Sequence, residues 1–183
     1  MSGVRGRSGA EVFVDESKAR DYLLVAVVVL SSEMAEARSA IRRLTPHGQS
    51  RIHMTKESDG RRRLILGAVS ALNLGVTIYR AEKRGRTELV RRELCLRALV
   101  SDLARANHSR LCLERDDTLV SRDRQHLIDA TRKTGTDGVL SYRHESAVSE
   151  PLLALPDSLA WAWAKGGDWR RRCPQDAVRV ADL

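Results

Sequence analysis

The pattern of apolar and polar positions predicts a pair of strands at the start of the chain. Residues 11–15 alternate between polar and apolar side chains and end in an acidic cluster, which is typical of a strand that ends at a turn. Residues 22–30 are an unbroken apolar run rich in Val, which indicates a strand covered on both faces. Six residues separate the two ranges, so we expect an antiparallel hairpin with a polar loop.

Signals for helices and strands follow along the rest of the chain. Ser31 or Ser32 can cap a helix that extends to about residue 44, because a hydroxyl oxygen accepts a hydrogen bond from a free N–H of the first turn. Asp59 can cap a second helix through residue 74, and Thr87 a third to about residue 106. The other predicted elements are helices over 121–134 and within 152–165, and strands over 76–79, 111–114 and 139–142.

This order of elements predicts an α/β fold. Two strands and two helices come first, and strand and helix then alternate, which favours parallel strands joined by right-handed crossovers. We therefore expect a mixed sheet of about five strands flanked by helices. The length of 183 residues suits a single domain, which we place at residues 11–183, with residues 1–10 as a flexible tail.

The composition favours a cytoplasmic protein with no membrane partner. The longest apolar run has nine residues, whereas a membrane-spanning helix needs about 20. No secretion signal is visible near the start. Three cysteines without CxxC spacing favour neither a disulfide framework nor a thiolate zinc site. The sequence predicts no oligomeric state.

The charge balance makes nucleic acid a candidate partner. The formal net charge is +8, and 27 of the 32 basic residues are Arg, which binds phosphate in a bidentate manner. The same Arg bias also arises in GC-rich genomes, so charge alone does not establish such a partner. The Arg triplets at 61–63 and 170–172 fit a solvated face as well as a phosphate contact. Trp161, Trp163 and Trp169 fit core packing as well as base stacking.

Acidic residues recur where predicted elements end. Asp15 ends the first strand beside Glu16, Glu114 ends the fourth strand near Asp117, and Asp157 opens the last helix. If strands one and four are parallel neighbours, Asp15 and Glu114 leave from the same edge of the sheet and can share a cation. Carboxylate oxygens suit Mg²⁺, and a pair of such ions activates water against a phosphodiester. Acidic residues are also common in turns and helix starts, so the pattern alone leaves both interpretations open.

Several short motifs occur in a distinctive order along the chain. They are Val-Phe-Val-Asp-Glu-Ser at 12–17, the apolar strand at 22–30, Arg-Ile-His-Met at 51–54 with Lys-Glu-Ser at 56–58, Leu-Cys-Leu-Glu at 111–114, and Glu-Pro-Leu-Leu-Ala-Leu-Pro-Asp-Ser-Leu-Ala-Trp at 150–161. Together they resemble an uncharacterised bacterial family that is grouped with the ribonuclease H-like fold. Its members open with a strand ending in Asp-Glu-Ser and close with a Leu-rich helix that contains an Asp. The similarity extends over residues 11–172.

The resemblance implies a metal site made of three carboxylates. Asp15, Glu114 and Asp157 correspond to the acids of the first strand, the fourth strand and the final helix that hold Mg²⁺ or Mn²⁺ in ribonuclease H-like nucleases. The fold usually supplies another acid from the helix after the third strand, where Glu88 and Glu93 are both available. These two side chains project about 140° apart on a helix, so at most one of them can face the site.

Two residues depart from the family pattern, and one histidine has two interpretations. Lys18 stands where the family has Gly after Asp-Glu-Ser, which changes the hairpin loop. A helix that begins at Pro156 would shift Asp157 relative to the other acids. His53, in a predicted short strand, is either a histidine satisfied by hydrogen bonds in an apolar segment or a general base or phosphate contact.

These observations lead to one functional hypothesis and one alternative. The hypothesis is a metal-dependent phosphodiester hydrolase, a nuclease that uses Asp15, Glu114 and Asp157, with Glu16 and Asp117 in reserve. The alternative is a non-catalytic module that binds nucleic acid or protein and retains the fold. The motifs GxxxxGK[ST], GxGxxG, GxSxG and HExxH do not occur, so P-loop, dinucleotide-binding, serine-hydrolase and zinc-protease interpretations have no support.

Overall fold

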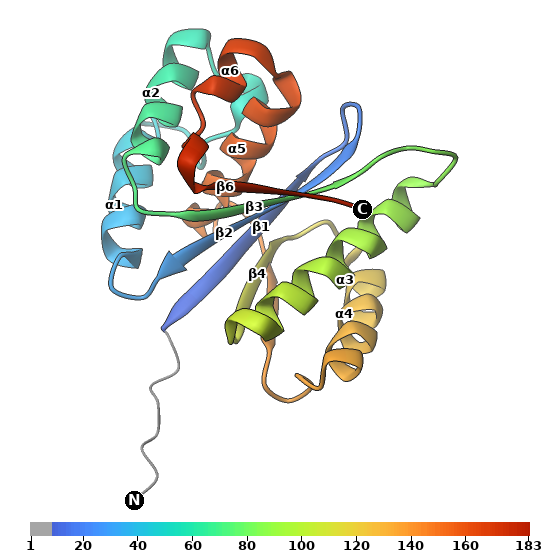
Figure 1. Ribbon diagram of the computed structural model, residues 1–183. Coiled ribbons are helices and arrows are strands. Elements are labelled where there is room, and N and C mark those ends of the chain that lie inside the picture. Colours follow the sequence, from blue (N-terminus) through green and yellow to red (C-terminus); the bar gives the residue numbers. More distant parts are fainter. Residues whose placement is uncertain (1–8) are drawn as a thin grey trace, which may run out of the picture.

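A six-stranded mixed sheet forms the middle layer of the protein. In the computed structural model, which describes residues 9–183, the strands are β1 (Ala10–Ser17), β2 (Tyr22–Leu30), β3 (Gly75–Ala81), β4 (Arg110–Glu114), β5 (Ser141–Glu145) and β6 (Val178–Asp182). Their order is β5-β4-β1-β2-β3-β6, and β2 is antiparallel to both of its neighbours (Figure 1). The other pairings are parallel. The α/β fold and the opening antiparallel hairpin are therefore confirmed.

The sheet has one strand more than the sequence indicates. β6 has five residues, extends the sheet at its edge and pairs in parallel with β3. Its side chains are half-buried or exposed, and Val180 is 40% exposed. A short edge strand with little burial leaves only a weak hydrophobic pattern, which explains why the sequence does not reveal it.

At the other end of the chain, the predicted tail lies largely outside the described residues. Residues 1–8 fall there, whereas Ala10 is already the first residue of β1, pairs with Leu30 and is buried.

Helices cover both faces of the sheet and create two apolar cores. α1 (Met34–Leu44), α2 (Asp59–Ser70), α5 (Ala154–Lys165) and α6 (Gly167–Arg171) lie on one face, and α3 (Glu88–Ala106) and α4 (Val120–Thr134) lie on the other (Figure 1). Val25 and Val27 pack in the first core, and Leu24 and Ala26 pack in the second. β2 is thus covered on both faces, as its unbroken apolar run predicts. No helix within residues 9–183 has the length and apolar character that a membrane crossing requires.

The helix starts differ in part from those predicted. The hydroxyl of Thr87 accepts a hydrogen bond from the N–H of Val90, as expected for the cap of α3. α2 is capped by Ser58 rather than Asp59, and it ends at Ser70 instead of residue 74. α1 begins after Glu33 without a side-chain cap, because residues 31–33 form a turn between β2 and the helix.

A buried ion network connects the hairpin to the helices of the second face. Arg92 of α3 donates to both oxygens of Asp123 of α4 at 2.7 Å, and at 2.8 Å to Glu16 of β1. It also donates to the hydroxyl of Tyr22, and Asp123 contacts the ring of His144 in β5. Burial disfavours a charged carboxyl, but the Arg92 hydrogen bonds hold the pKa of Asp123 below its usual value. The network fixes the end of the hairpin against two helices.

Arg92→Met is expected to lower the free energy of unfolding by about 3–5 kcal/mol, because it leaves two carboxylates without their buried cation. Urea unfolding at neutral pH measures this loss. Arg122→Met, on the exposed side of α4, serves as the control and is expected to change stability by less than about 0.5 kcal/mol. A loss below about 1 kcal/mol for Arg92→Met would show that the network does not hold the hairpin in place.

Candidate metal-binding site

Two acidic side chains lie side by side at the carboxyl ends of β1 and β4. Val14 pairs with Leu113 in the parallel register, so the following residues, Asp15 and Glu114, are neighbours. Alternation along each strand turns both toward the face that carries α5, because Phe13 and Cys112 belong to that core. The two carboxyl groups act on each other, because the charge of Glu114 raises the pKa of Asp15. The structure therefore brings together the two strand acids that the sequence singles out.

Asp157 reaches the same place from α5, which packs on β1 and β2. The N–H of Met54 donates to its Oδ2 at 3.2 Å, and its charge acts on Asp15. α5 begins at Ala154, directly after a short 3₁₀ turn, so Pro156 falls in the first helical turn, where no partner for its missing N–H is needed. The helix does not begin at Pro156, and Asp157 faces the strand acids.

The environment of Asp15 and that of Asp157 favour the neutral form of each side chain. Burial raises the pKa of Asp15 well above its usual value, and the charges of Glu114, Asp157 and Glu16 raise it further. Burial also raises the pKa of Asp157, opposed by the Met54 N–H and by the charges of His53 and Arg51. Asp15 and Asp157 therefore keep a proton to a higher pH than an ordinary aspartate does.

One arginine approaches the acidic group from the loop before α2. Arg51 Nη1 donates to Glu114 Oε1 at 2.8 Å. Its side chain and that of Glu114 are both partly exposed, so this ion pair lies at the mouth of the site. Glu114 is therefore held between a carboxyl group on one side and a guanidinium on the other.

His53 lies beside Asp157 without forming the predicted strand. It precedes a 3₁₀ helix, Met54–Lys56, and Met54 is fully buried while the His53 ring is half-buried. The ring contacts the hydroxyl of Thr55 at 3.3 Å. Its charge acts on Asp157, which places it at the edge of the acidic group.

A fourth carboxylate, which the sequence analysis misses, extends the row of acids. Glu145 of β5 pairs with Glu114 in the parallel register, on the same face of the sheet. Its side chain is 35% exposed and contacts Arg143 at 3.4 Å. The predicted fifth strand ends at residue 142, so the prediction leaves Glu145 outside the sheet. In the structure β5 continues to Glu145. Acids at the carboxyl ends of three parallel neighbours were the signal that could have revealed it.

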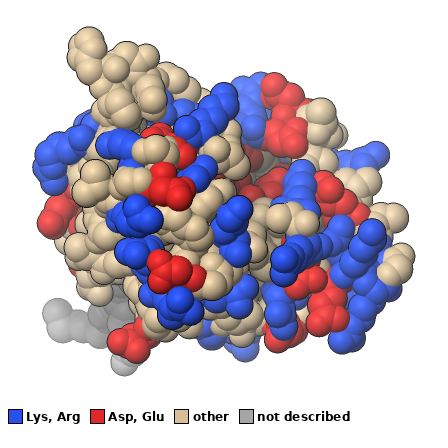
Figure 2. Space-filling view, turned by 90° about the horizontal axis from the view of Figure 1, so that it is seen from above, with Lys and Arg blue, Asp and Glu red and all other residues tan. Residues whose placement is uncertain are grey.

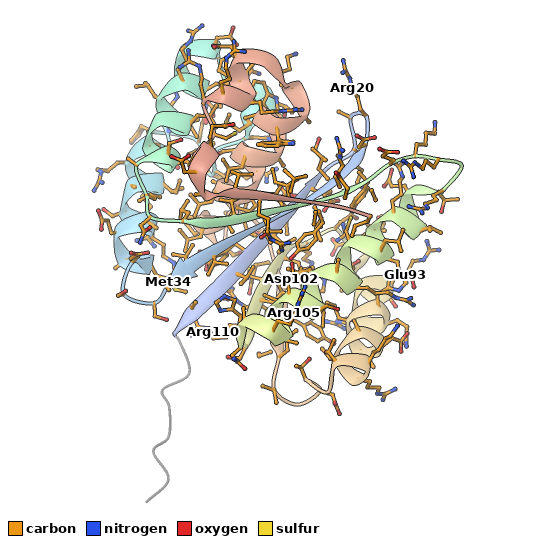
Figure 3. The ribbon with its side chains drawn as sticks, viewed as in Figure 1. Arg20, Met34, Glu93, Asp102, Arg105 and Arg110 are labelled. Carbon is orange, nitrogen blue, oxygen red and sulfur yellow. The ribbon has the colours of Figure 1, made fainter. Side chains whose placement is uncertain are left out.

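The other acids considered from the sequence pair with basic side chains elsewhere. Glu16 points to the opposite face, toward Arg92. Glu88 contacts Lys18 at 2.9 Å. Glu93 contacts Arg97 and lies on the side of α3 near α4, where His126 is 3.9 Å away (Figure 3). Asp117 is 78% exposed and pairs with Arg115. The structure gathers Asp15, Glu114 and Asp157, and it does not bring these other four side chains into the group.

The end of the sheet that carries these acids has a mixed surface. Figure 2, which looks down on the top of Figure 1, shows Lys and Arg spread over the whole face, with Asp and Glu between them and also inside a recess. Within residues 9–183, no three His, Cys, Asp or Glu side chains are already arranged as a ligand set. Arg51 already pairs with Glu114, and burial favours the neutral form of Asp15. Binding of a cation requires that Glu114 leave Arg51 and that Asp15 lose its proton.

Asp15→Asn is expected to stabilise the metal-free protein by about 1–2 kcal/mol at pH 7. In the unfolded chain Asp15 titrates near 3.8, and in the folded protein its pKa is higher. Between these values the folded state binds more protons, so stability falls as pH rises, and the loss is complete above the folded pKa. Asn does not titrate and avoids this loss.

Urea unfolding from pH 3 to pH 8 tests this expectation, with Asp129→Asn on the exposed side of α4 as the matched control. The advantage of Asp15→Asn should shrink toward acidic pH and vanish below about 3.8. An Asn variant that is less stable than the original at pH 7 would contradict the raised pKa.

Comparison with known proteins assigns no family to the chain. No protein-family model matches it, and no curated protein sequence matches it. The ribonuclease H-like resemblance of its motifs therefore stays a prediction. What the acidic group does follows from the positions and charges of its own residues.

Proposed function

We propose that this protein is a Mg²⁺- or Mn²⁺-dependent phosphodiester hydrolase of the ribonuclease H-like class, in which Asp15, Glu114 and Asp157 hold the metal. The observation that carries the proposal is the placement of Asp15 beside Glu114 at one edge of the sheet, with Asp157 of α5 close enough for its charge to act on Asp15. Carboxylates gathered in this way repel one another, and a divalent cation removes that repulsion. The donor set consists of oxygen atoms, which suits both ions.

The origins of the three acids support the ribonuclease H-like class. One comes from the first strand, one from its parallel neighbour β4, and one from a helix late in the chain. These are the origins that the motif resemblance implies for the metal ligands of such nucleases. Glu145, at the end of β5, is available as a further carboxylate at the same edge of the sheet.

The residues around the acids have defined tasks in this proposal. When bound, divalent ions activate a water and stabilise the leaving oxygen of a phosphodiester. The N–H of Met54 orients the carboxylate of Asp157 toward the strand ends. With a metal bound, Glu114 would be a ligand instead of the partner of Arg51, and the N–H groups of Arg51 would be available to a phosphate group. Burial of Asp15 fixes its carboxylate and excludes bulk water from one side of the site.

An Arg- and Trp-rich surface next to the site supports a phosphate-bearing polymer as the substrate. Arg62 stacks on Trp161 at 4.5 Å, one turn of α5 beyond Asp157, and donates to the carbonyl of Met54. Further stacked pairs are Arg63 with Trp169 at 5.7 Å and Arg170 with Trp163 at 4.8 Å. Stacking holds each guanidinium against its ring. Arg62 and Arg170 also donate to the backbone carbonyls of Met54 and Trp163, whereas Arg63 is exposed and its N–H groups can meet phosphate oxygens. This surface begins at the acidic group and leads away over α2, α5 and α6.

Arg51 is the specific reason to keep the non-catalytic alternative. Its guanidinium already neutralises Glu114, so a protein that has lost metal binding would retain this arrangement. In that case the protein binds nucleic acid or another protein through the Arg- and Trp-rich surface and hydrolyses nothing. The two functions differ in how hydrolysis responds to metal and to loss of Asp15.

Purified protein is expected to hydrolyse at least one of four substrates, single-stranded DNA, duplex DNA, RNA and an RNA–DNA hybrid, when Mg²⁺ or Mn²⁺ is present. Asp15→Asn should lower the rate by about 100-fold or more, because it removes a charged ligand without changing the shape of the side chain. Gel separation of labelled oligonucleotides measures the rate. Chelation of divalent ions should abolish it.

Asp117→Asn provides the matched control, since Asp117 follows β4 closely but is exposed and paired with Arg115. It should retain the original rate. Cleavage that persists in Asp15→Asn would contradict the assigned site. If the protein binds nucleic acid but hydrolyses none of the four substrates with either Mg²⁺ or Mn²⁺, the result would support the non-catalytic alternative.

A further inference from the structure

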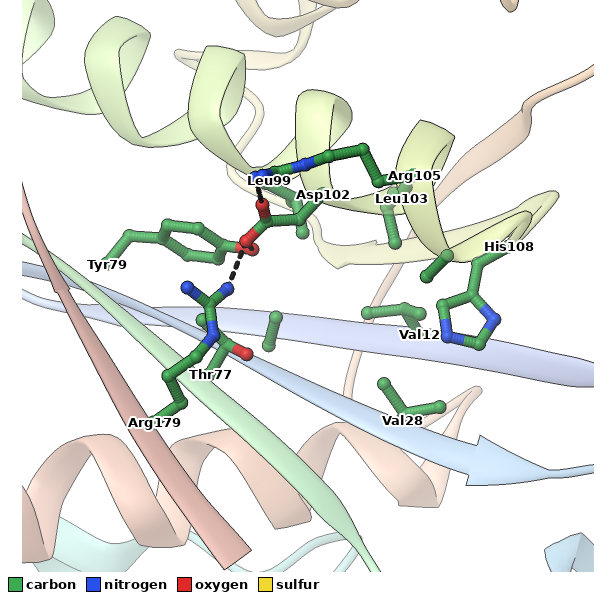
Figure 4. A pocket seen from close by; sticks show the side chains of 12 residues that line it. Val12, Val28, Thr77, Tyr79, Leu99, Asp102, Leu103, Arg105, His108 and Arg179 are labelled. Atoms are coloured by element: carbon green, nitrogen blue, oxygen red, sulfur yellow. Dashed lines mark hydrogen bonds and ion pairs between the residues drawn. The ribbon is translucent and has the colours of Figure 1, made fainter.

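A cavity lies on the other face of the sheet, away from the acidic group. It has a volume of about 430 Å³ and lies between α3 and strands β1, β2, β3 and β6 (Figure 4). Cavities of about 300–1,000 Å³ are typical of small-molecule sites. Its floor and wall are apolar and consist of Val12, Ala26, Val28, Leu99 and Leu103. The sheet separates this cavity from Asp15, whose side chain faces α5.

One end of the cavity carries an excess of positive charge. Asp102 of α3 accepts hydrogen bonds from the hydroxyl of Tyr79, at 2.8 Å, and from Arg105 and Arg179 (Figure 4). Burial disfavours its charged form, but these donors keep the pKa of Asp102 below its usual value. Burial raises the pKa of Tyr79, so its hydroxyl stays neutral. Two guanidinium groups thus face one carboxylate, which leaves one positive charge at this end.

The other end carries a polar atom that lacks a partner. His108 Nδ1 is buried and forms no hydrogen bond with the described part of the chain. α3 ends at Asn107 in the left-handed conformation, and the N–H of His108 then donates to the carbonyl of Leu103, which turns the ring toward the cavity (Figure 4). Burial lowers the pKa of the ring, so it is neutral at pH 7. A buried polar atom without a partner costs free energy that a ligand can recover.

We propose that this cavity binds a small aryl carboxylate that carries a hydroxyl group at the end opposite its carboxylate. The apolar ring lies on Val28, which is partly exposed, and the carboxylate pairs with the guanidinium groups of Arg105 and Arg179. The distal hydroxyl forms a hydrogen bond with the imidazole ring of His108. The proposal is independent of the hydrolase proposal, since the two sites share no residue.

Isothermal titration calorimetry with p-coumarate tests this site, with cinnamate and cinnamyl alcohol as matched probes. Cinnamate lacks the distal hydroxyl, and cinnamyl alcohol lacks both that hydroxyl and the carboxylate. We expect p-coumarate to bind with a dissociation constant below about 1 mM. Cinnamate should bind several-fold more weakly, and cinnamyl alcohol more weakly still.

Three variants separate the contributions of the carboxylate, the hydroxyl and the cavity volume to binding. Arg179→Met, at an exposed position, should weaken the binding of p-coumarate about tenfold or more, because it removes a charge-assisted hydrogen bond. His108→Phe should abolish the preference for p-coumarate over cinnamate. Leu103→Trp should fill the cavity and prevent binding of both. Arg122→Met, on α4 outside the cavity lining, should bind like the original protein.

Amide chemical shifts of the original protein give a test that needs no variant. Titration with p-coumarate should shift the amide signals of Leu103, His108 and Thr77 most strongly. Absence of saturable binding below about 5 mM would overturn the proposal. Equal affinity for Arg179→Met and the original protein, or shifts centred away from these residues, would overturn it as well.

Discussion

The parallel pairing of β1 with β4 is the constraint on which the acidic site depends. Val14 lies opposite Leu113, so the register sets Asp15 beside Glu114 at the ends of two strands. α5 then covers both and adds Asp157. Burial and neighbouring charges raise the pKa of Asp15, and burial raises that of Asp157, whereas Glu114 pairs with Arg51. The proposed metal chemistry rests on this arrangement.

Strand alternation divides the charges of the hairpin between the two faces of the sheet. Glu16 follows Asp15 directly and therefore points to the other face, where Arg92, Asp123 and Tyr22 form a closed network. This network stabilises the fold and keeps Glu16 out of the acidic site. Asp15 instead meets another carboxyl group, which raises the pKa of Asp15 and costs stability when Asp15 is charged. Asp15 and Glu16 thus have opposite effects on stability, because successive side chains of a strand point to opposite faces of the sheet.

Local patterns in the sequence are sufficient to predict the core elements and part of the acidic site. The apolar run of β2, the Thr87 cap and the end of β4 at Glu114 depend on neighbouring residues, so the sequence reveals them, whereas β1 continues past Asp15 to Ser17. The prediction that Asp157 is a metal ligand rests on the motif resemblance. Its burial near the strand acids is visible only in the tertiary structure.

The remaining features depend on contacts between segments that lie far apart in the chain. Arg51 reaches Glu114 across 63 positions, and Glu145 joins the row of acids only through the register of β4 and β5. β6 and the cavity beside Arg179 and His108 likewise require the packing of β6 and α3 around the sheet. The hydrophobic periodicity of a single helix or strand does not predict such contacts.

Proton release on Mn²⁺ binding is the most direct test of the acidic site. Calorimetric titration in two buffers of different ionisation enthalpy, near pH 6, gives the number of protons released with each bound ion. The proposed site predicts saturable Mn²⁺ binding with release of protons by the original protein, because a bound cation favours the charged form of Asp15, and greatly weakened binding by Asp15→Asn. Absence of Mn²⁺ binding, or equal binding and proton release by Asp15→Asn, would contradict the account.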